Sequence, residues 1–170
     1  GAPRIVGLTS SGNLAFCRSL GCYDEVLSYY AVATMDRATP SVYVDFAGNA
    51  ALRRAVHQHF GDALRYSCSV GGTHWDELGA GRNLPGPRPT LFFAPAQIVK
   101  RSAAPPAGWG QAGLQARIAA AWAAFMKPVN DPEAPWLRVR TAHGPQAVHD
   151  ACLALLDGKV DARDGLMLSL

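Results

Sequence analysis

The stretch Arg4-Ile-Val-Gly-Leu-Thr-Ser-Ser-Gly-Asn13 joins a short apolar run to a turn of small hydroxyl residues. The apolar run Ile5–Leu8 predicts a buried strand, and Thr9, Ser10 and Ser11 predict the turn that ends it. Beyond Asn13 the apolar residues recur at helical intervals. We therefore expect a strand, a polar turn and a short helix, with a side chain from residues 11–13 capping the helix.

The same alternation continues along the chain. Apolar runs predict further strands over residues 25–29, 42–46, 64–70, 90–93, 136–140 and 165–170, and helical spacing predicts helices over residues 50–60, 114–126 and 144–156. Strands and helices that alternate through short connections predict an α/β fold, here a Rossmann-like parallel sheet flanked by helices. We expect a single, partial nucleotide-binding domain over residues 1–170, with residues 111–170 as its C-terminal extension.

Composition excludes several classes of protein. The 170 residues are 49% hydrophobic and 17% charged, which is the balance of one folded domain. The net charge of +3 is small and its cations are scattered, so nucleic acid is not expected as a partner. No apolar run approaches the roughly 20 residues that span a bilayer, and no signal peptide is evident. We expect a cytoplasmic protein without a membrane partner.

The four cysteines are Cys17, Cys22, Cys68 and Cys152. They form no CxxC pair, and their spacing is not that of a disulfide framework. We expect free, buried thiols, which fits a reducing compartment.

In open parallel sheets, ligands bind beyond the carboxyl ends of the strands. Three predicted strands end there in small or polar residues: Thr9–Asn13, Ala47–Asn49, and Val70–Gly72. The first turn offers hydroxyls and N–H groups to a phosphate, although an isolated turn of this kind is also an ordinary N-cap. Glycines in the other two turns allow close approach to a flat ligand, but ordinary strand-to-helix turns use the same residues.

Several polar residues are candidates for a chemical role. Asp45 lies within an apolar strand, so it either faces the ligand or binds neighbouring turn amides. His57 and His59 point away from each other on a helix, which predicts solvated side chains and no metal site. His74 follows the Gly-Gly turn and is the candidate proton donor, the alternative being a loop histidine packed on Trp75.

Phe92 and Phe93 lie at the end of the strand predicted over residues 90–93. Their rings could wall a nicotinamide or substrate pocket together with Gln97. Paired aromatic residues are also common in ordinary cores.

Five segments occur in an order that resembles the medium-chain dehydrogenase/reductase superfamily, in particular a bacterial branch related to quinone oxidoreductases. They are Ile5–Asn13, Leu20–Val26, Val42–Gly48, Tyr66–Gly72 and Gly158–Gly165. The resemblance implies that Thr9, Ser10, Ser11 and Asn13 contact the adenosine ribose and its 2′-phosphate, and the absence of an acidic residue there favours NADP over NAD. It also implies contacts to the nicotinamide end from the residues of the other turns: Ala47, Gly48, Asn49, Val70, Gly71, Gly72, and more loosely Phe92 and Phe93.

The chain departs from that pattern at its beginning. The first strand of such a sheet and its Gly-rich pyrophosphate turn would precede Ile5, and that strand is central in the order 3-2-1-4-5-6. We therefore expect a gap in the sheet, and a fragment, a cleaved chain or a partner chain that supplies the rest.

The expected function is the NADP(H)-binding portion of an oxidoreductase that reduces a carbonyl, enone or quinone by hydride transfer. Its partners are a small-molecule substrate and the missing segment, and a homodimer stays open. The alternative is a non-catalytic subunit or interaction module with a vestigial nucleotide site.

Overall fold

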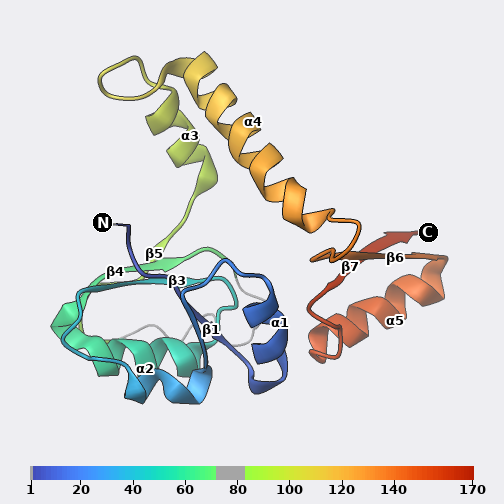
Figure 1. Ribbon diagram of the computed structural model, residues 1–170, viewed down its shortest axis with the longest axis horizontal. Coiled ribbons are helices and arrows are strands. Elements are labelled where there is room, and N and C mark those ends of the chain that lie inside the picture. Colours follow the sequence, from blue (N-terminus) through green and yellow to red (C-terminus); the bar gives the residue numbers. More distant parts are fainter. Residues whose placement is uncertain (1, 72–82) are drawn as a thin grey trace. The chain divides into compact units, whose positions relative to one another are not determined.

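A computed structural model describes residues 2–71 and 83–170, and its contacts divide the chain into two compact units. Unit 1 comprises Gly1–Phe92 and unit 2 comprises Phe93–Leu170 (Figure 1). The strands are β1 (Val6–Thr9), β2 (Glu25–Ser28), β3 (Ser41–Asp45), β4 (Leu64–Ser69), β5 (Thr90–Leu91), β6 (Arg138–His143) and β7 (Asp164–Ser169). The α-helices are α1 (Leu14–Ser19), α2 (Ala50–Phe60), α3 (Ala94–Ser102), α4 (Gly110–Val129) and α5 (Pro145–Leu156), and short 3-10 turns include η1 (Ser11–Asn13) and η2 (Tyr29–Thr34).

Unit 1 contains two small sheets in which every pair of neighbouring strands is parallel. In the first sheet β1 pairs with β2, with Val6 opposite Glu25. In the second sheet the order is β3-β4-β5, with Asp45 opposite Ser69. Parallel neighbours require crossover connections, which α1 and α2 supply.

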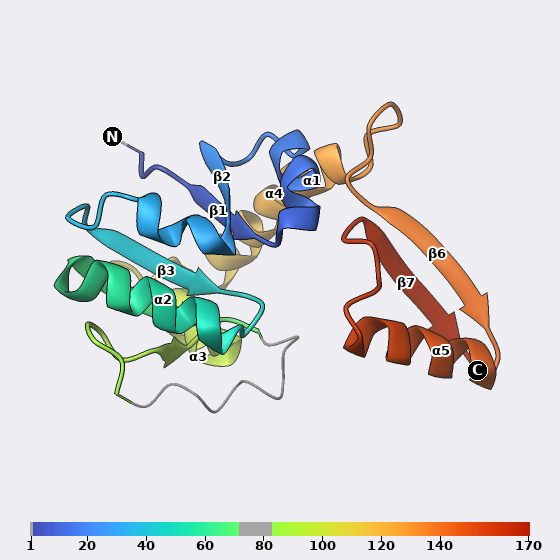
Figure 2. The same ribbon diagram turned by 90° about the horizontal axis from the view of Figure 1, so that it is seen from below.

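Strands β1 and β3 are each an edge strand of their sheet. Among the described residues no ladder joins them, although Figure 2 shows them in neighbouring layers of unit 1 with their arrows running the same way. The strand order is β1 to β2 in the first sheet and β3 to β4 to β5 in the second. The strands of unit 1 that the structure describes thus form two separate parallel sheets and not one continuous sheet.

The core of unit 1 lies between α2 and the sheet β3-β4. Leu52, Val56 and Phe60 of α2 recur every four residues and are buried against Tyr43 and Leu64. Leu8 of β1 packs on the margin of the same cluster, which ties the two sheets together. Each of these large apolar side chains contributes about 1.5–3 kcal/mol through burial.

On the opposite face of this sheet, β3 carries exposed side chains. Val42 and Val44 alternate with the buried Tyr43 along β3, and they are 61% and 44% exposed. Strands of parallel sheets usually have both faces covered.

Unit 2 contains a helical hairpin and a βαβ module. Helices α3 and α4 pack on each other and are joined by a short Pro/Gly-rich connection. Strands β6 and β7 pair in parallel and are joined by the crossover helix α5. None of the helices that the structure describes is long and apolar enough to cross a membrane.

The α/β class with parallel strands flanked by helices is confirmed. Some local expectations are wrong. Strand β5 ends at Leu91, and Phe93 is the N-cap of helix α3, which the sequence does not predict and which carries a proline in its first turn. No side chain of Asn13 caps α1. The cysteines are free, but only Cys68 is buried, and Cys22 and Cys152 are exposed.

Candidate functional site

The candidate site is the edge of unit 1 where strands β1, β3 and β4 end. After β1 the chain turns through η1, and the side chains of Ser10 and Ser11 are exposed, while Thr9 and Asn13 are half-buried. Neither Ser10 nor Asn13 makes a side-chain capping bond to the helical turn that follows it. The turn therefore presents hydroxyl groups to solvent, and its local structure rests on the backbone bond from Asn13 N to Ser10 O (3.0 Å).

The turn after β3 is organised by Asp45, which is buried. Its Oδ1 accepts a hydrogen bond from Gly48 N at 2.8 Å, and its Oδ2 accepts two from Arg53 of α2, from Nε at 3.1 Å and Nη2 at 3.0 Å. Gly48 has φ 75°, a conformation that suits glycine. Asn49 caps α2, with Oδ1 accepting from Leu52 N at 2.8 Å. Asp45 thus binds turn amides, as the simpler of the two sequence interpretations predicts.

The turn after β4 is tied to the end of β3. Val70 N donates to Asp45 O at 2.8 Å, and Gly71 N reaches the same oxygen at 3.4 Å. A Cβ atom on Gly71 would lie 2.8 Å from Phe46 O, which is closer than such atoms approach. The glycine is therefore required for the two turns to lie side by side.

Phe92 follows β5, and its N donates to Ser69 O at 2.8 Å. The side chain of Phe92 is half-exposed. Phe93 belongs to unit 2. Gly72 and His74 lie outside the described residues, as does Trp75.

Two histidines expected in solvent are in fact bonded, so that prediction is wrong. His57 is fully buried, with Nδ1 2.8 Å from Pro85 O and Nε2 2.9 Å from Ser67 Oγ. Because a carbonyl only accepts, Nδ1 carries the proton and Nε2 accepts from the Ser67 hydroxyl. His59 Nε2 lies 2.9 Å from Met35 O.

Sequence reasoning also missed Arg53. Arg53, Val56, His57 and Phe60 follow the spacing of one helical face, and all of them are buried. The sequence signal for this pair is an acidic residue within the apolar strand that precedes α2, Asp45, together with a basic residue on the buried face of α2, Arg53.

The buried carboxylate of Asp45 contributes to the raised pKa values of two nearby tyrosines. Burial raises the pKa of Tyr43, and the nearby Asp45 raises it further. Burial also raises the pKa of Tyr29, with smaller contributions from Cys17 and Asp45. Both phenols therefore stay neutral under ordinary conditions.

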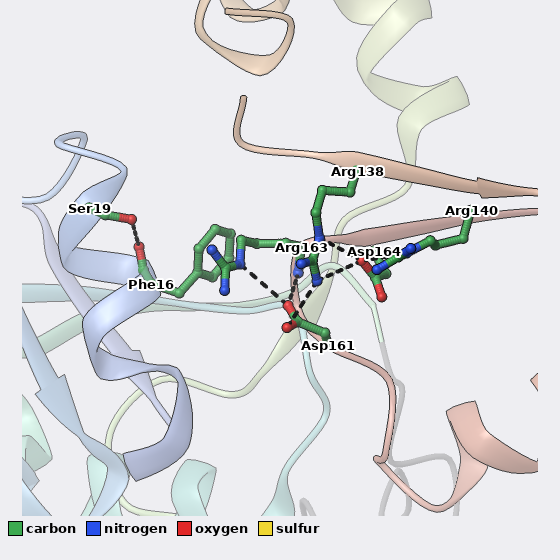
Figure 3. Close-up of polar contacts among 7 residues, drawn as sticks. All are labelled: Phe16, Ser19, Arg138, Arg140, Asp161, Arg163 and Asp164. Atoms are coloured by element: carbon green, nitrogen blue, oxygen red, sulfur yellow. Dashed lines mark hydrogen bonds and ion pairs between the residues drawn. The ribbon is translucent and has the colours of Figure 1, made fainter. Parts of the chain in front are cut away.

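A second charged cluster lies in unit 2, in the β6/β7 module (Figure 3). Arg138 Nη2 lies 3.1 Å from Asp161 Oδ2 and 2.8 Å from Asp164 Oδ1, while Arg140 lies farther from Asp164, at 3.5 Å. The Arg163 backbone N–H is the largest cause that lowers the pKa of Asp161, followed by Arg138 and then the Arg163 guanidinium. The pairs link β6 to the turn before β7, so we interpret the cluster as a structural one.

No group of three metal-ligating side chains occurs within residues 2–71 and 83–170. The chemistry that the edge of unit 1 offers is that of hydroxyls, backbone amides and closely packed glycine turns. Such an edge can hold a phosphorylated ligand.

Comparison with known proteins yields no match among curated proteins and none among solved structures. The resemblance to the medium-chain dehydrogenase/reductase superfamily is wrong as an assignment, since no family model of that superfamily matches the chain. The model that matches, over residues 1–161, is that of DUF2855, described as a protein of unknown function, and the chain belongs to this family.

Proposed function

We propose that unit 1 is the NADP(H)-binding portion of an oxidoreductase that reduces a carbonyl, enone or quinone by hydride transfer. The observation that carries this proposal is the topology of unit 1. It contains two parallel sheets in which β1 and β3 are edge strands, and we propose that the strand order of a doubly wound sheet reverses between them. A point where strand order reverses leaves a crevice beyond the carboxyl ends of the strands, and this is where doubly wound folds bind nucleotides.

The residues around that crevice suit a phosphorylated nucleotide. Ser10 and Ser11 expose hydroxyls at the end of β1, and hydroxyls and amides are good donors to a phosphate. No acidic residue occurs between Thr9 and Asn13. An acid at this position would bind a ribose 2′-hydroxyl and repel a 2′-phosphate, so its absence favours NADP(H).

The turns after β3 and β4 would serve the nicotinamide end of the cofactor. Gly48 has φ 75°, and Gly71 lies so close to Phe46 O that it leaves no room for a side chain; a flat ring needs such close approach to a backbone. The cofactor supplies the hydride, and the protein orients it toward the electrophilic carbon of the substrate while a proton goes to the substrate's oxygen. His74 is the candidate donor of that proton.

The pyrophosphate is the part of the cofactor that the described residues do not explain. We propose that a further strand, from an additional segment or a partner chain, lies between the edge strands β1 and β3 and pairs with both. This strand would supply the Gly-rich turn. In Figure 2 the arrows of β1 and β3 run the same way, as one parallel strand between them would require.

The test is a titration of the protein with NADPH and NADH, followed by nicotinamide fluorescence. We expect NADPH to bind more tightly, and Ser10→Asp to weaken NADPH by at least about tenfold while affecting NADH less, since the new carboxylate faces the 2′-phosphate. Ser41→Asp makes the same change at the amino end of β3 and should leave both affinities unchanged. Equal binding of the two cofactors, or none, would overturn the proposal.

A second candidate function is a non-catalytic subunit whose nucleotide site is vestigial. Among the described residues, β1 and β3 each have one edge without a partner strand. This favours the second function, because exposed strand edges are also templates for pairing with another chain. Formation of a stable complex through these edges, in a protein that binds neither cofactor, would support this function over the first.

A further inference from the structure

The hairpin of α3 and α4 carries an unusual distribution of charge. No Asp or Glu occurs anywhere between Leu78 and Asn130, whereas the hairpin itself contains Lys100, Arg101, Arg117 and Lys127. All four cationic residues are exposed. No ion pair involves them within the part of the chain that the structure describes. The hairpin is thus a local region of positive charge in a protein whose net charge is only +3.

The same hairpin exposes large apolar side chains. Leu114, Ile118, Trp122, Phe125 and Val129 follow one another at spacings of three or four residues along α4, so they form one stripe. The stripe is buried at its ends, at Leu114 and Val129, and open in the middle, where Trp122 is 62% and Phe125 is 51% exposed. Val99 of α3 adds another exposed apolar side chain.

Cations and aromatic rings are placed together at the closed end of the hairpin. The guanidinium carbon of Arg101 lies 4.7 Å from the ring centroid of Trp109, and that of Arg117 lies 4.5 Å from it. Arg101 comes from α3 and Arg117 from α4, so the indole holds the two helices together while both guanidinium groups remain exposed.

We propose that this hairpin surface, formed by the four cations together with Val99, Trp109, Ile118, Trp122 and Phe125, binds the surface of an anionic lipid bilayer. Helices that lie in the membrane interface combine Trp, Phe and Leu on one face with Lys and Arg beside it. Anionic headgroups attract such cations, and indole rings favour the headgroup level. The binding needs no spanning helix, which agrees with the absence of one among the described helices.

The positive charge of the hairpin argues against other binding partners for this surface. A second copy of the hairpin would place its four cations against the same four, without an acidic residue on either side, and like charges at an interface are unfavourable. An acidic protein could satisfy the cations, but the open aromatic stripe with flanking Lys and Arg is the pattern of a bilayer surface. This inference is independent of the nucleotide site in unit 1.

The test is sedimentation of the full chain with vesicles of phosphatidylcholine alone and with about 30% phosphatidylserine. We expect binding to the anionic vesicles only, a blue shift of tryptophan emission on binding, and a loss of binding as salt rises from about 0.1 M to 0.5 M. Trp122→Phe should reduce the shift. Lys100→Glu with Lys127→Glu should weaken binding by at least about thirtyfold, and it leaves the contacts of Trp109 intact.

Arg54→Glu with Arg65→Glu is the matched control, because both arginines are exposed in unit 1 and the net charge changes equally. It should retain vesicle binding, and circular dichroism should show that both variants fold. An equal loss in the two variants would reduce the effect to net charge and overturn the proposal. So would absence of vesicle binding, self-association of the protein that competes with vesicles, or binding to polyglutamate without binding to vesicles.

Discussion

Arg53 Nε and Nη2 both donate to one oxygen of Asp45, at 3.1 and 3.0 Å, and both side chains are buried. The pair joins α2 to the end of β3, where the candidate site begins. The other oxygen of the carboxylate accepts a hydrogen bond from Gly48 N. One ion pair therefore fixes both the helix and the turn.

Arg53→Met is expected to destabilise the protein by about 3–5 kcal/mol, because it leaves a buried carboxylate without its cation. Arg54→Met, at the exposed neighbouring position, should change stability by less than about 0.5 kcal/mol. Urea unfolding of both variants measures the difference. Adding Asp45→Asn to Arg53→Met should restore part of the loss, and equal stabilities of the two single variants would contradict the pairing.

Tyr43 gives a prediction about alkaline conditions. Its pKa is raised above the ordinary value of 10.0 by burial and by Asp45. The unfolded chain releases this proton first, so stability is full below about pH 10 and falls as the pH rises further, by up to about 1.4 kcal/mol per pH unit. Tyr43→Phe removes the contribution of Tyr43 to this dependence, while that of Tyr29 remains. Denaturant unfolding between about pH 9 and pH 11 should show the steeper decline in the wild type, and identical slopes would refute the assignment.

The buried histidine predicts a specific tautomer. Pro85 O can only accept, so His57 carries its proton on Nδ1 and receives the hydroxyl proton of Ser67 on Nε2. Nitrogen NMR should show Nε2 unprotonated near neutral pH. Ser67→Ala should cost about 1–3 kcal/mol, since Nε2 is left buried without a donor.

Ser19 provides the control for this change. Its hydroxyl donates to Phe16 O at 2.7 Å on the exposed side of α1 (Figure 3). Ser19→Ala should change stability by less than about 0.5 kcal/mol. A protonated Nε2 in the spectrum, or equal effects of the two alanine variants, would show that the buried bond is not formed as described.

The sequence predicts the α/β class well because strands such as β1 and β3 are apolar runs that are followed within a few residues by a glycine. Helix α2 was predicted from Ala50 to Phe60, where periodicity and the terminal Gly61 agree. Helix α3 was missed because residues 90–93 continue an apolar run and Pro95 suggests a break, although proline in a first turn favours a helix.

The site was predicted less well, for a physical reason. Glycine turns at the ends of β3 and β4 are visible in sequence, but the partners of a buried polar group depend on tertiary packing. The sequence predicts a solvated side chain for His57 and singles out no role for Arg53, and only the packing of α2 on the sheet shows why both are buried. The family assignment failed because an ordered set of strand-end turns is shared by many parallel α/β folds.

Two glycines at the candidate site differ in the space that surrounds them. A Cβ atom on Gly71 would lie 2.8 Å from Phe46 O, whereas one on Gly12 would meet no atom within 4 Å. Gly71→Ala is therefore expected to destabilise the protein by about 1–3 kcal/mol, since the ends of β3 and β4 must move apart. Gly12→Ala should change stability by less than about 0.5 kcal/mol. Thermal unfolding of both variants measures this, and equal effects would show that the two turns do not touch. If the nucleotide binds where these turns meet, Gly71→Ala should also weaken NADPH at temperatures where the variant is fully folded.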